Sequence, residues 1–350
     1  MNRLITILAL WSALFLMVAV DYDSGESYCV LFPQNGRDIF GVAQRTILVV
    51  GDDEVALIPQ VHFEGDARDF GILVPVPAEP RLSMVGANIF SEASFMTQPL
   101  VRQSSSGCGC DDDNIAGSRF ILNAADDRSL VTEDESGVTV IYEDIVGMFQ
   151  AAVLQATNAQ DLTEWLNTNG YWFNPDDTEI LDGYVADDWF FVAMKFDTTQ
   201  VPQNIDRWWN ATTSPAKITF DYSQSSLTYP LKISAISTNE RTEVLVYTIS
   251  KNPMRFPGAE VEYANQFDVE EVEAASFQYP TLASFIAPGA FVTKLRRTFA
   301  KSEMQADIQI SVTDDRREFR DILYVNNGSM GVWGALLFAV AIYCRRRKTA

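Results

Sequence analysis

The clearest structural pattern in the chain lies at residues 138–170, VTVIYEDIVGMFQAAVLQATNAQDLTEWLNTNG. Two runs of β-branched and apolar residues, 138–145 and 148–155, are separated by one tight turn, which predicts a pair of strands. The following residues predict a helix that Thr157 or Asn158 caps. Its apolar face and its C-terminal end are formed by Leu162, Trp165, Leu166 and Gly170. A strand pair followed directly by an amphipathic helix is therefore expected.

Strand-like stretches dominate on both sides of this segment, and helices are inserted among them. The further predicted strands are 47–50, 55–63, 70–76, 189–196, 218–220, 229–236, 243–249 and 291–299. The further predicted helices are 85–96, 178–185 and 277–286, the last interrupted by Pro280. Because the order has no regular strand–helix alternation, it indicates an α+β fold with a mostly antiparallel sheet. Residues 98–114 are expected to form a polar loop, the pattern weakens after Ser302, and 126–137 is either a domain boundary or part of an inserted loop.

Hydrophobic segments at the two ends of the chain predict membrane addressing. Residues 4–20 follow Arg3 and carry few polar side chains, which is typical of a signal peptide. The possible cleavage points lack the usual pair of small residues, so 1–20 is either a cleaved signal peptide or an uncleaved signal anchor. Residues 330–344 are uncharged and are expected to form a transmembrane or sorting helix, either retained or processed. The cations that follow it, as a membrane stop in the basic cytoplasmic tail 345–350, are Arg345, Arg346, Arg347 and Lys348.

The signal segment and the C-terminal membrane segment place the residues between them outside the cytoplasm. The predicted organisation is an extracytoplasmic domain at 21–325 followed by a polar spacer at 326–329. We therefore expect a cell-membrane protein with a single pass after signal cleavage, with membrane lipid as a partner.

The predicted extracytoplasmic part is strongly acidic. The whole chain carries a formal net charge of −21. Residues 21–329, which exclude the basic residues of the two terminal segments, hold 21 basic and 47 acidic side chains, a net charge of −26. Such a surface repels phosphate backbones, so no nucleic-acid partner is predicted. With 47% hydrophobic residues, the chain has enough apolar material for a packed core, which argues against a disordered protein.

Three cysteines fall in the exported part, namely Cys29, Cys108 and Cys110. Because their number is odd, one is free, pairs with another chain or is modified. A disulfide from Cys29 to Cys108 or Cys110 is mechanically easier than one within the Cys-Gly-Cys stretch. The acidic run beside Cys110 disfavours a thiolate, so a structural role is favoured over a redox role.

Patterns for catalysis and metal binding are scarce. His62 is the single histidine, which excludes multi-histidine zinc sites and leaves no strong Ser/His/Asp arrangement. Several acidic runs offer oxygen ligands to calcium, but none has the order of an EF-hand loop. These runs are Asp52–Glu54, Asp111–Asp113, Asp176–Asp177 and Asp187–Asp188. They are interpreted as solvated turn charges, and no catalytic residue, metal ligand or cofactor is predicted.

Four separated stretches carry a resemblance to a known family. They are GDARDFGILVPVP at 65–77, LTEWLNTNGY at 162–171, YVADDWFFVAMK at 184–195 and YPLKIS at 229–234. In this order they resemble the bacterial family catalogued as domain of unknown function 2330, over roughly residues 29–300. The resemblance implies an exported protein, often with a hydrophobic C-terminal tail and basic residues. It also implies cysteines after the signal and in the middle loop, which adds weight to a bridge from Cys29, but it implies no activity.

Two functions remain open. The first is a non-catalytic binding or structural protein of the cell envelope, with an envelope protein or a glycan as partner. Trp208 and Trp209 are its candidate recognition patch, because adjacent aromatic residues on a strand face opposite ways and one can be exposed. The alternative is a secreted enzyme that uses paired carboxylates or the thiols of Cys108 and Cys110.

Overall fold

The computed structural model describes residues 30–33, 43–60, 70–103, 129–130, 137–147, 149–171, 173–196, 215–222 and 226–325. The predicted signal segment 1–20, the apolar run 330–344 and the basic tail 345–350 lie outside these residues. Within the described ranges, no helix is both long and apolar enough to cross a membrane.

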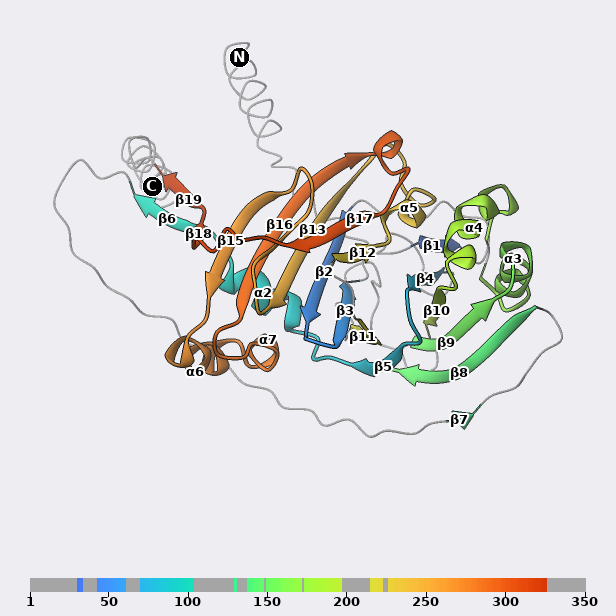
Figure 1. The fold of residues 1–350 in the computed structure, drawn as a ribbon, viewed down its shortest axis with the longest axis horizontal. Coiled ribbons are helices and arrows are strands. Elements are labelled where there is room, and N and C mark those ends of the chain that lie inside the picture. Colours follow the sequence, from blue (N-terminus) through green and yellow to red (C-terminus); the bar gives the residue numbers. More distant parts are fainter. Residues whose placement is uncertain are drawn as a thin grey trace, which may run out of the picture.

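Two large sheets make up most of the described fold (Figure 1). The first, six-stranded among the described residues, has the order β1-β4-β10-β9-β8-β7 and is antiparallel at each pairing. Its strands are β1 (Val30–Pro33), β4 (Phe70–Val76), β7 (Ser129–Leu130), β8 (Val138–Val146), β9 (Phe149–Ala156) and β10 (Phe190–Phe196). The second sheet has eight strands among the described residues, in the order β18-β15-β16-β13-β2-β3-β11-β5. Strands β2 and β13 run parallel in it. Its strands are β2 (Ala43–Val50), β3 (Glu54–Gln60), β5 (Arg81–Met84), β11 (Ala216–Asp221), β13 (Arg241–Ser250), β15 (Glu260–Gln266), β16 (Phe291–Ala300) and β18 (Phe319–Arg320).

Shorter strands and helices complete the described part. The order β12-β17-β14 forms a small antiparallel sheet from Ser226–Tyr229, Ile308–Val312 and Met254–Arg255, and β6 (Leu100–Gln103) pairs in parallel with β19 (Ile322–Val325). The α-helices are α2 (Ile89–Met96), α3 (Ala159–Thr168), α4 (Thr178–Ala186), α5 (Leu231–Ser234), α6 (Val269–Gln278) and α7 (Pro280–Ala283).

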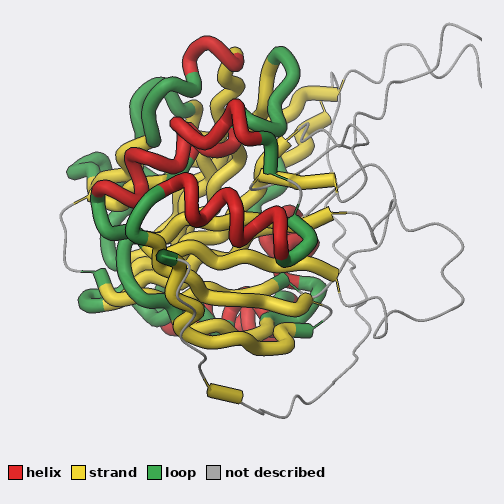
Figure 2. The backbone as a smooth tube through the Cα atoms, turned by 90° about the vertical axis from the view of Figure 1, so that its right-hand side faces the viewer, coloured by secondary structure: helices red, strands yellow, loops and turns green. Residues whose placement is uncertain are grey.

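The core lies in layers because neighbouring strand residues face opposite sides of a sheet. Val74 on β4 and Leu295 on β16 belong to a cluster that fills the space between the two large sheets. Leu73, the neighbour of Val74, packs instead under α3 and α4 on the outer face of the first sheet. A third cluster, including Tyr247, lies between the second sheet and helices α2, α6 and α7. Two facing sheets with helices outside form a layered α+β sandwich (Figures 1 and 2).

Most of the predicted elements are confirmed. The strand pair at 138–145 and 148–155 corresponds to β8 and β9, and the following helix is α3, whose N-cap Asn158 accepts a hydrogen bond from the Asp161 amide. The mostly antiparallel α+β class is also confirmed for the described strands. The local patterns of side-chain alternation and capping were sufficient for these elements.

Other predictions of secondary structure were wrong. A strand at 229–236 is replaced by the end of β12 and by α5, because Pro230 cannot donate to a ladder and the chain turns into a helix after it. Within the expected loop 98–114, residues 100–103 form β6. The helix predicted at 85–96 is confirmed over Ile89–Met96 and was only begun too early. The chain after Ser302, where no element was predicted, forms β17, β18 and β19.

Candidate functional site

An open cleft of about 680 Å³ lies where α4 and α5 meet β12, β17 and the ends of β4 and β11. It is bordered by the end of β4, by the C-terminal end of α4, by β11 and β12, and by the chain entering β17, so residues far apart in the sequence line it. Figure 1 shows where these elements lie in the fold. Its lining residues include Pro77, Tyr184, Asp187, Trp189, Asp221, Tyr222, Thr228, Lys232, Asp307 and Gln309.

The end of α4 places an aromatic pair in the cleft. Asp188 adopts a positive φ of 57° at the turn that ends the helix, and the Trp189 amide donates back to the Tyr184 carbonyl at 2.9 Å. This left-handed position usually holds glycine, although aspartate tolerates it better than most residues. The turn brings Trp189 against Tyr184, with ring centroids 5.2 Å apart and planes tilted by 55°. Tyr184 is buried and Trp189 is half-buried, so the indole forms part of the cleft wall.

Asp307 is the most strongly held carboxylate of the cleft. Its Oδ1 atom accepts hydrogen bonds from the Tyr184 hydroxyl and from the Lys232 amide, each at 2.8 Å. Burial raises the pKa of Asp307 above its ordinary value, although these hydrogen bonds favour the charged form. The carboxylate thus ties α4 to the start of α5 and keeps the Tyr184 ring in place behind Trp189.

A polar strip on β12 and β17 forms another wall. Thr228 lies opposite Gln309 in the antiparallel ladder. The Gln309 Oε1 atom accepts from the Ser226 and Thr228 hydroxyls at 3.2 Å, and its Nε2 atom donates to the Thr228 hydroxyl at 2.9 Å. These residues present hydroxyl and amide groups side by side toward the cleft.

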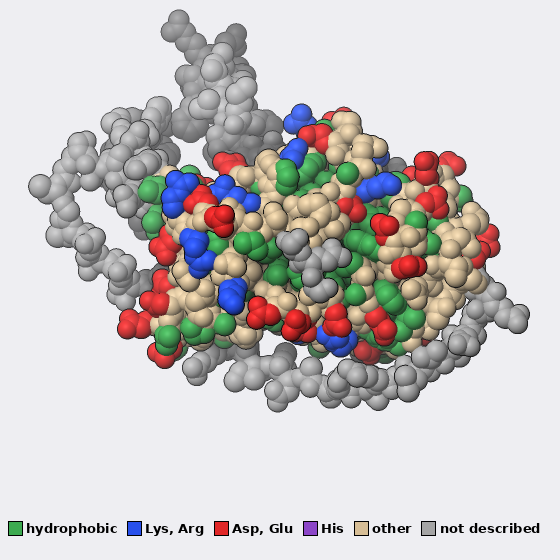
Figure 3. Space-filling model, viewed as in Figure 1, with side chains coloured by type: hydrophobic (Ala, Val, Ile, Leu, Met, Phe, Trp, Pro, Cys, Tyr) green, Lys and Arg blue, Asp and Glu red, His purple; other side chains and the backbone are tan. Residues whose placement is uncertain are grey.

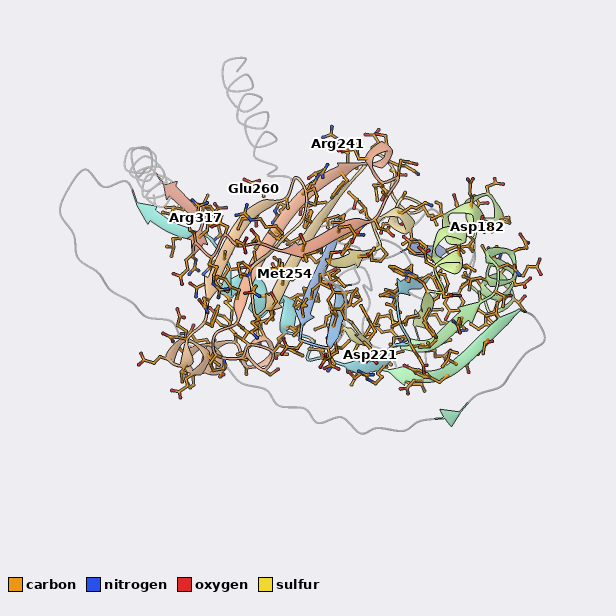
Figure 4. All side chains as sticks on the ribbon, viewed as in Figure 1. Asp182, Asp221, Arg241, Met254, Glu260 and Arg317 are labelled. Atoms are coloured by element: carbon orange, nitrogen blue, oxygen red, sulfur yellow. The ribbon has the colours of Figure 1, made fainter. Side chains whose placement is uncertain are left out.

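Asp221 and Lys232 contribute opposite charges to the cleft lining. Asp221, labelled in Figure 4, is exposed and forms an ion pair with Arg81 of β5 at 3.2 Å. Lys232 lies beside α4, since a Cβ atom built on Gly183 would stand 3.8 Å from its Nζ atom. With Asp187 and Asp307 also present, the cleft offers acceptors and one donor cation around its aromatic wall.

The arrangement suits a ligand with one apolar face and a hydroxyl-rich edge. Tryptophan and tyrosine rings offer flat apolar surfaces, whereas carboxylates, amides and an ammonium group accept and donate hydrogen bonds. The volume falls within the range of about 300–1,000 Å³ that is usual for small-ligand sites. Within the described ranges, no group of three or more His, Cys, Asp or Glu side chains is arranged to hold a metal ion.

Of the residues singled out from the sequence, Asp187 lines the cleft, although it was interpreted as a solvated turn charge. Cys29, Cys108 and Cys110 are outside the described residues, and so are the aromatic pair Trp208 and Trp209. The membrane-stop residues Arg345, Arg346, Arg347 and Lys348 are likewise outside them. The disulfide, the recognition patch and the membrane stop therefore stay predictions.

The cleft itself was missed by sequence reasoning, although a signal for it was present. Tyr184, Asp187 and Trp189 belong to the stretch 184–195, and Lys232 belongs to the stretch 229–234. Pro77 ends a third family-like stretch. Stretches that carried the family resemblance thus meet at one place, which periodicity within each of them did not reveal.

Comparison with protein families agrees with this resemblance. The family described as "Uncharacterized protein conserved in bacteria (DUF2330)" matches residues 25–311. The chain belongs to this family. The match spans all the described cleft residues, and the family description states no activity.

Comparisons with individual proteins add little to the family assignment. A search of curated proteins found no match. Among solved structures, this member of the family is similar to the crystal structure of baculovirus P35, with 10% identity, a TM-score of 0.33, and coverage of 84% of this chain and 100% of that chain. A mutated baculovirus P35 after caspase cleavage is similar at 7% identity and a TM-score of 0.33, with coverage of 77% and 91%.

Proposed function

We propose that this chain is a membrane-anchored, extracytoplasmic protein that binds a saccharide of the bacterial envelope in the cleft beside α4, without catalysis. Export and anchoring are supported by the apolar segments at 1–20 and 330–344 and by the cations at 345–348. The strongly acidic composition supports a partner other than nucleic acid.

One observation carries the choice of ligand. The half-buried indole of Trp189 lines the same cleft as Asp187, Lys232 and Gln309. A sugar ring has an apolar C–H face that stacks on such an indole and a rim of hydroxyl groups that pair with these polar side chains. A concave site of this volume fits a few sugar units better than the broad surface of an envelope protein.

Direct binding tests this proposal. The purified full-length protein is titrated calorimetrically with a panel of soluble oligosaccharides released from peptidoglycan and lipopolysaccharide. We expect a Trp189→Ala variant to weaken binding up to about tenfold, because loss of a stacked ring costs up to about 1.5 kcal/mol. Phe277→Ala is the matched control, since Phe277 is an exposed aromatic residue on α6 outside the cleft lining, and it is expected to bind as the wild type does. Absence of binding across the panel, or equal binding by the Trp189 variant, would contradict the proposal.

A carboxylate-dependent hydrolase is the second candidate. It is favoured by the raised pKa of Asp307 beside Asp187 and Asp221 in one cleft, an arrangement that can provide a proton donor. The same oligosaccharides are incubated with wild type and with Asp307→Asn, and newly formed reducing ends are counted. Cleavage by the wild type that disappears in the variant would favour the hydrolase, whereas we expect no cleavage by either. The thiol-based version rests on Cys108 and Cys110, which are outside the described residues.

A further inference from the structure

The pair of strands β6 and β19 exposes apolar side chains on both of its faces. Leu100 and Ile322 are direct partners in the parallel ladder and share one face, with 41% and 37% of their surface exposed. Leu323 follows Ile322 and therefore faces the other way, with 54% exposed. A two-stranded sheet is at best marginally stable in water unless another layer covers it. This ribbon thus offers two apolar faces that the described residues leave in solvent.

Further exposed apolar residues adjoin the ribbon. Phe95 at the end of α2 is 60% exposed and Phe319 on β18 is 45% exposed. Both belong to the same end of the molecule, because the Arg320 guanidinium donates to the carbonyls of Met96 and Gln98 and the Leu100 amide donates to the Asp321 carbonyl. Phe95, Leu100, Phe319, Ile322 and Leu323 together form what is called here the ribbon surface.

The ribbon surface lies at one end of the described fold, on the left in Figure 1, away from α3 and α4. On the face shown in Figure 3, Lys and Arg side chains gather at this end beside hydrophobic ones, while Asp and Glu predominate along the lower and right-hand edges. Arg317, labelled in Figure 4, lies here with 87% of its side chain exposed and forms an ion pair with Asp315 at 2.8 Å. On this face of an acidic protein, the region where cations gather is repelled least by an anionic bilayer.

The chain leaves the described fold at this same place. Strand β19 ends at Val325 and the apolar run begins at Met330, so the connection spans roughly 18 Å at most when fully extended. A compact domain with as many residues as the predicted domain 21–325 has a radius of gyration of about 19 Å and a larger outer radius. The connection is therefore shorter than the radius of the domain. If 330–344 enters the bilayer, the end of β19 must lie close to the lipid headgroups.

We infer that the ribbon surface is the face on which the domain rests on its own membrane, with its apolar side chains at the level of the headgroups and upper acyl chains. This inference rests on the membrane anchoring in the proposed function. The exposed ribbon then has a layer to pack against, and the nearby arginines lie close to anionic headgroups. Helix α4, which borders the cleft, lies at the end of the fold away from the bilayer.

Photo-crosslinking to lipid tests this orientation. The full-length protein is placed in nanodiscs of phosphatidylcholine and phosphatidylglycerol that contain a phospholipid with a diazirine near its headgroup, and labelled peptides are mapped by mass spectrometry. We expect peptides covering 95–100 and 319–323 to carry at least fivefold more label than the peptide with Phe277. Phe277 is 81% exposed, more than any residue of the ribbon surface, so labelling by exposure alone would favour it.

Matched variants make the result specific. Replacing Ile322→Ser together with Leu323→Ser is expected to lower label in the 319–323 peptide at least threefold, and Phe277→Ser to leave it unchanged. Retention in the discs with equal label at Phe277 and at the ribbon would overturn the inference while leaving the anchoring intact, and so would chain-to-chain crosslinks through the ribbon in place of lipid label. Failure of the full chain to stay with the discs would overturn the anchoring and the inference with it.

Discussion

Glu262 on β15 holds two cations on the helix-covered face of the second sheet. Its carboxylate forms an ion pair with Lys294 at 2.7 Å, and their side chains are only 17% and 10% exposed. Arg296 also bonds to Glu262 and reaches Glu243 on β13. Burial acts to raise the pKa of Glu262, but the hydrogen bonds from Arg296 and Lys294 outweigh it and hold the pKa below the ordinary value of 4.5.

The first prediction concerns Glu262→Gln. At pH 7 the free energy of unfolding is expected to fall by about 2 kcal/mol, because Lys294 stays buried without its charged partner. Since the pKa is lowered by folding, Glu262 stabilises the native state above about pH 4.5 and this stabilisation is lost as the pH falls through the lower native pKa. The variant should therefore lose less stability than the wild type below pH 4.5, as measured by urea unfolding at several pH values.

An exposed ion pair supplies the control for this prediction. Glu54 pairs with Arg81 at 3.0 Å, with 61% and 54% of their side chains exposed. Solvent screens such a pair, so Glu54→Gln should have no measurable effect at pH 7. If both variants lowered the free energy of unfolding equally, burial would not explain the contribution of Glu262 to stability.

At the scale of elements, β4 and the segment that follows α3 approach each other very closely. A Cβ atom added to Gly71 would stand 2.3 Å and 2.8 Å from the Cδ1 and Cε1 atoms of Tyr171. The Tyr171 ring cannot move aside easily, since it is buried and stacks on Trp165 with centroids 6.1 Å apart. Only glycine allows the first sheet to receive this ring, which is a physical reason for the Phe-Gly-Ile order within the family-like stretch 65–77.

Gly71→Ala is accordingly expected to destabilise the protein by roughly 1–3 kcal/mol through overpacking. The measurement is the midpoint and slope of urea unfolding followed by far-UV circular dichroism. An unchanged midpoint would mean that the ring has space that the structure does not show.

Gly183→Ala is the matched control, and the opposite sign is expected for it. Gly183 lies inside α4, and an added Cβ atom would meet only the Lys232 Nζ atom at an ordinary 3.8 Å. Alanine in place of glycine within a helix is expected to stabilise the protein by up to about 1 kcal/mol. If Gly183→Ala lowered the free energy of unfolding instead, the packing around the cleft would need glycine at this position.

At the scale of the whole molecule, one cluster joins the two large sheets. Ile72, Val153 and Met194 from the first sheet pack in the same cluster as Val246 and Leu295 from the second. Because each sheet covers the other, neither can lose its partner without exposing its inner face to water. The described fold should therefore unfold as one unit.

Leu295→Ala tests this cooperativity. Leu295 has no exposed surface, and its truncation is expected to cost about 2–5 kcal/mol. Trp165 and Trp189, which lie beside the first sheet, contribute to the tryptophan fluorescence. The unfolding midpoints from fluorescence and from far-UV circular dichroism should shift to lower urea together, although Leu295 lies in the second sheet. Two separate transitions, with only one of them affected, would contradict a single cooperative unit.

The sequence alone was informative wherever structure depends on near neighbours. Strands such as β8, β9 and β13, and helix α3 with its Asn158 cap, are recognisable because alternation, helical spacing and capping act within a few residues. The four family-like stretches and the acidic composition were equally legible. Strands β6 and β19 were not predicted, because polar or charged residues flank them and each is short. Their pairing joins residues that are far apart in the sequence.

Tertiary packing was needed for everything that joins distant segments. The parallel pairing of β2 with β13, for example of Ile47 with Tyr247, depends on complementary surfaces that no local pattern encodes. The cleft likewise requires the end of α4 to meet Asp307 and Lys232, since only the tertiary fold brings residues so far apart in the chain within hydrogen-bond distance. Local periodicity reports which face of a segment is buried, but it does not report against which partner.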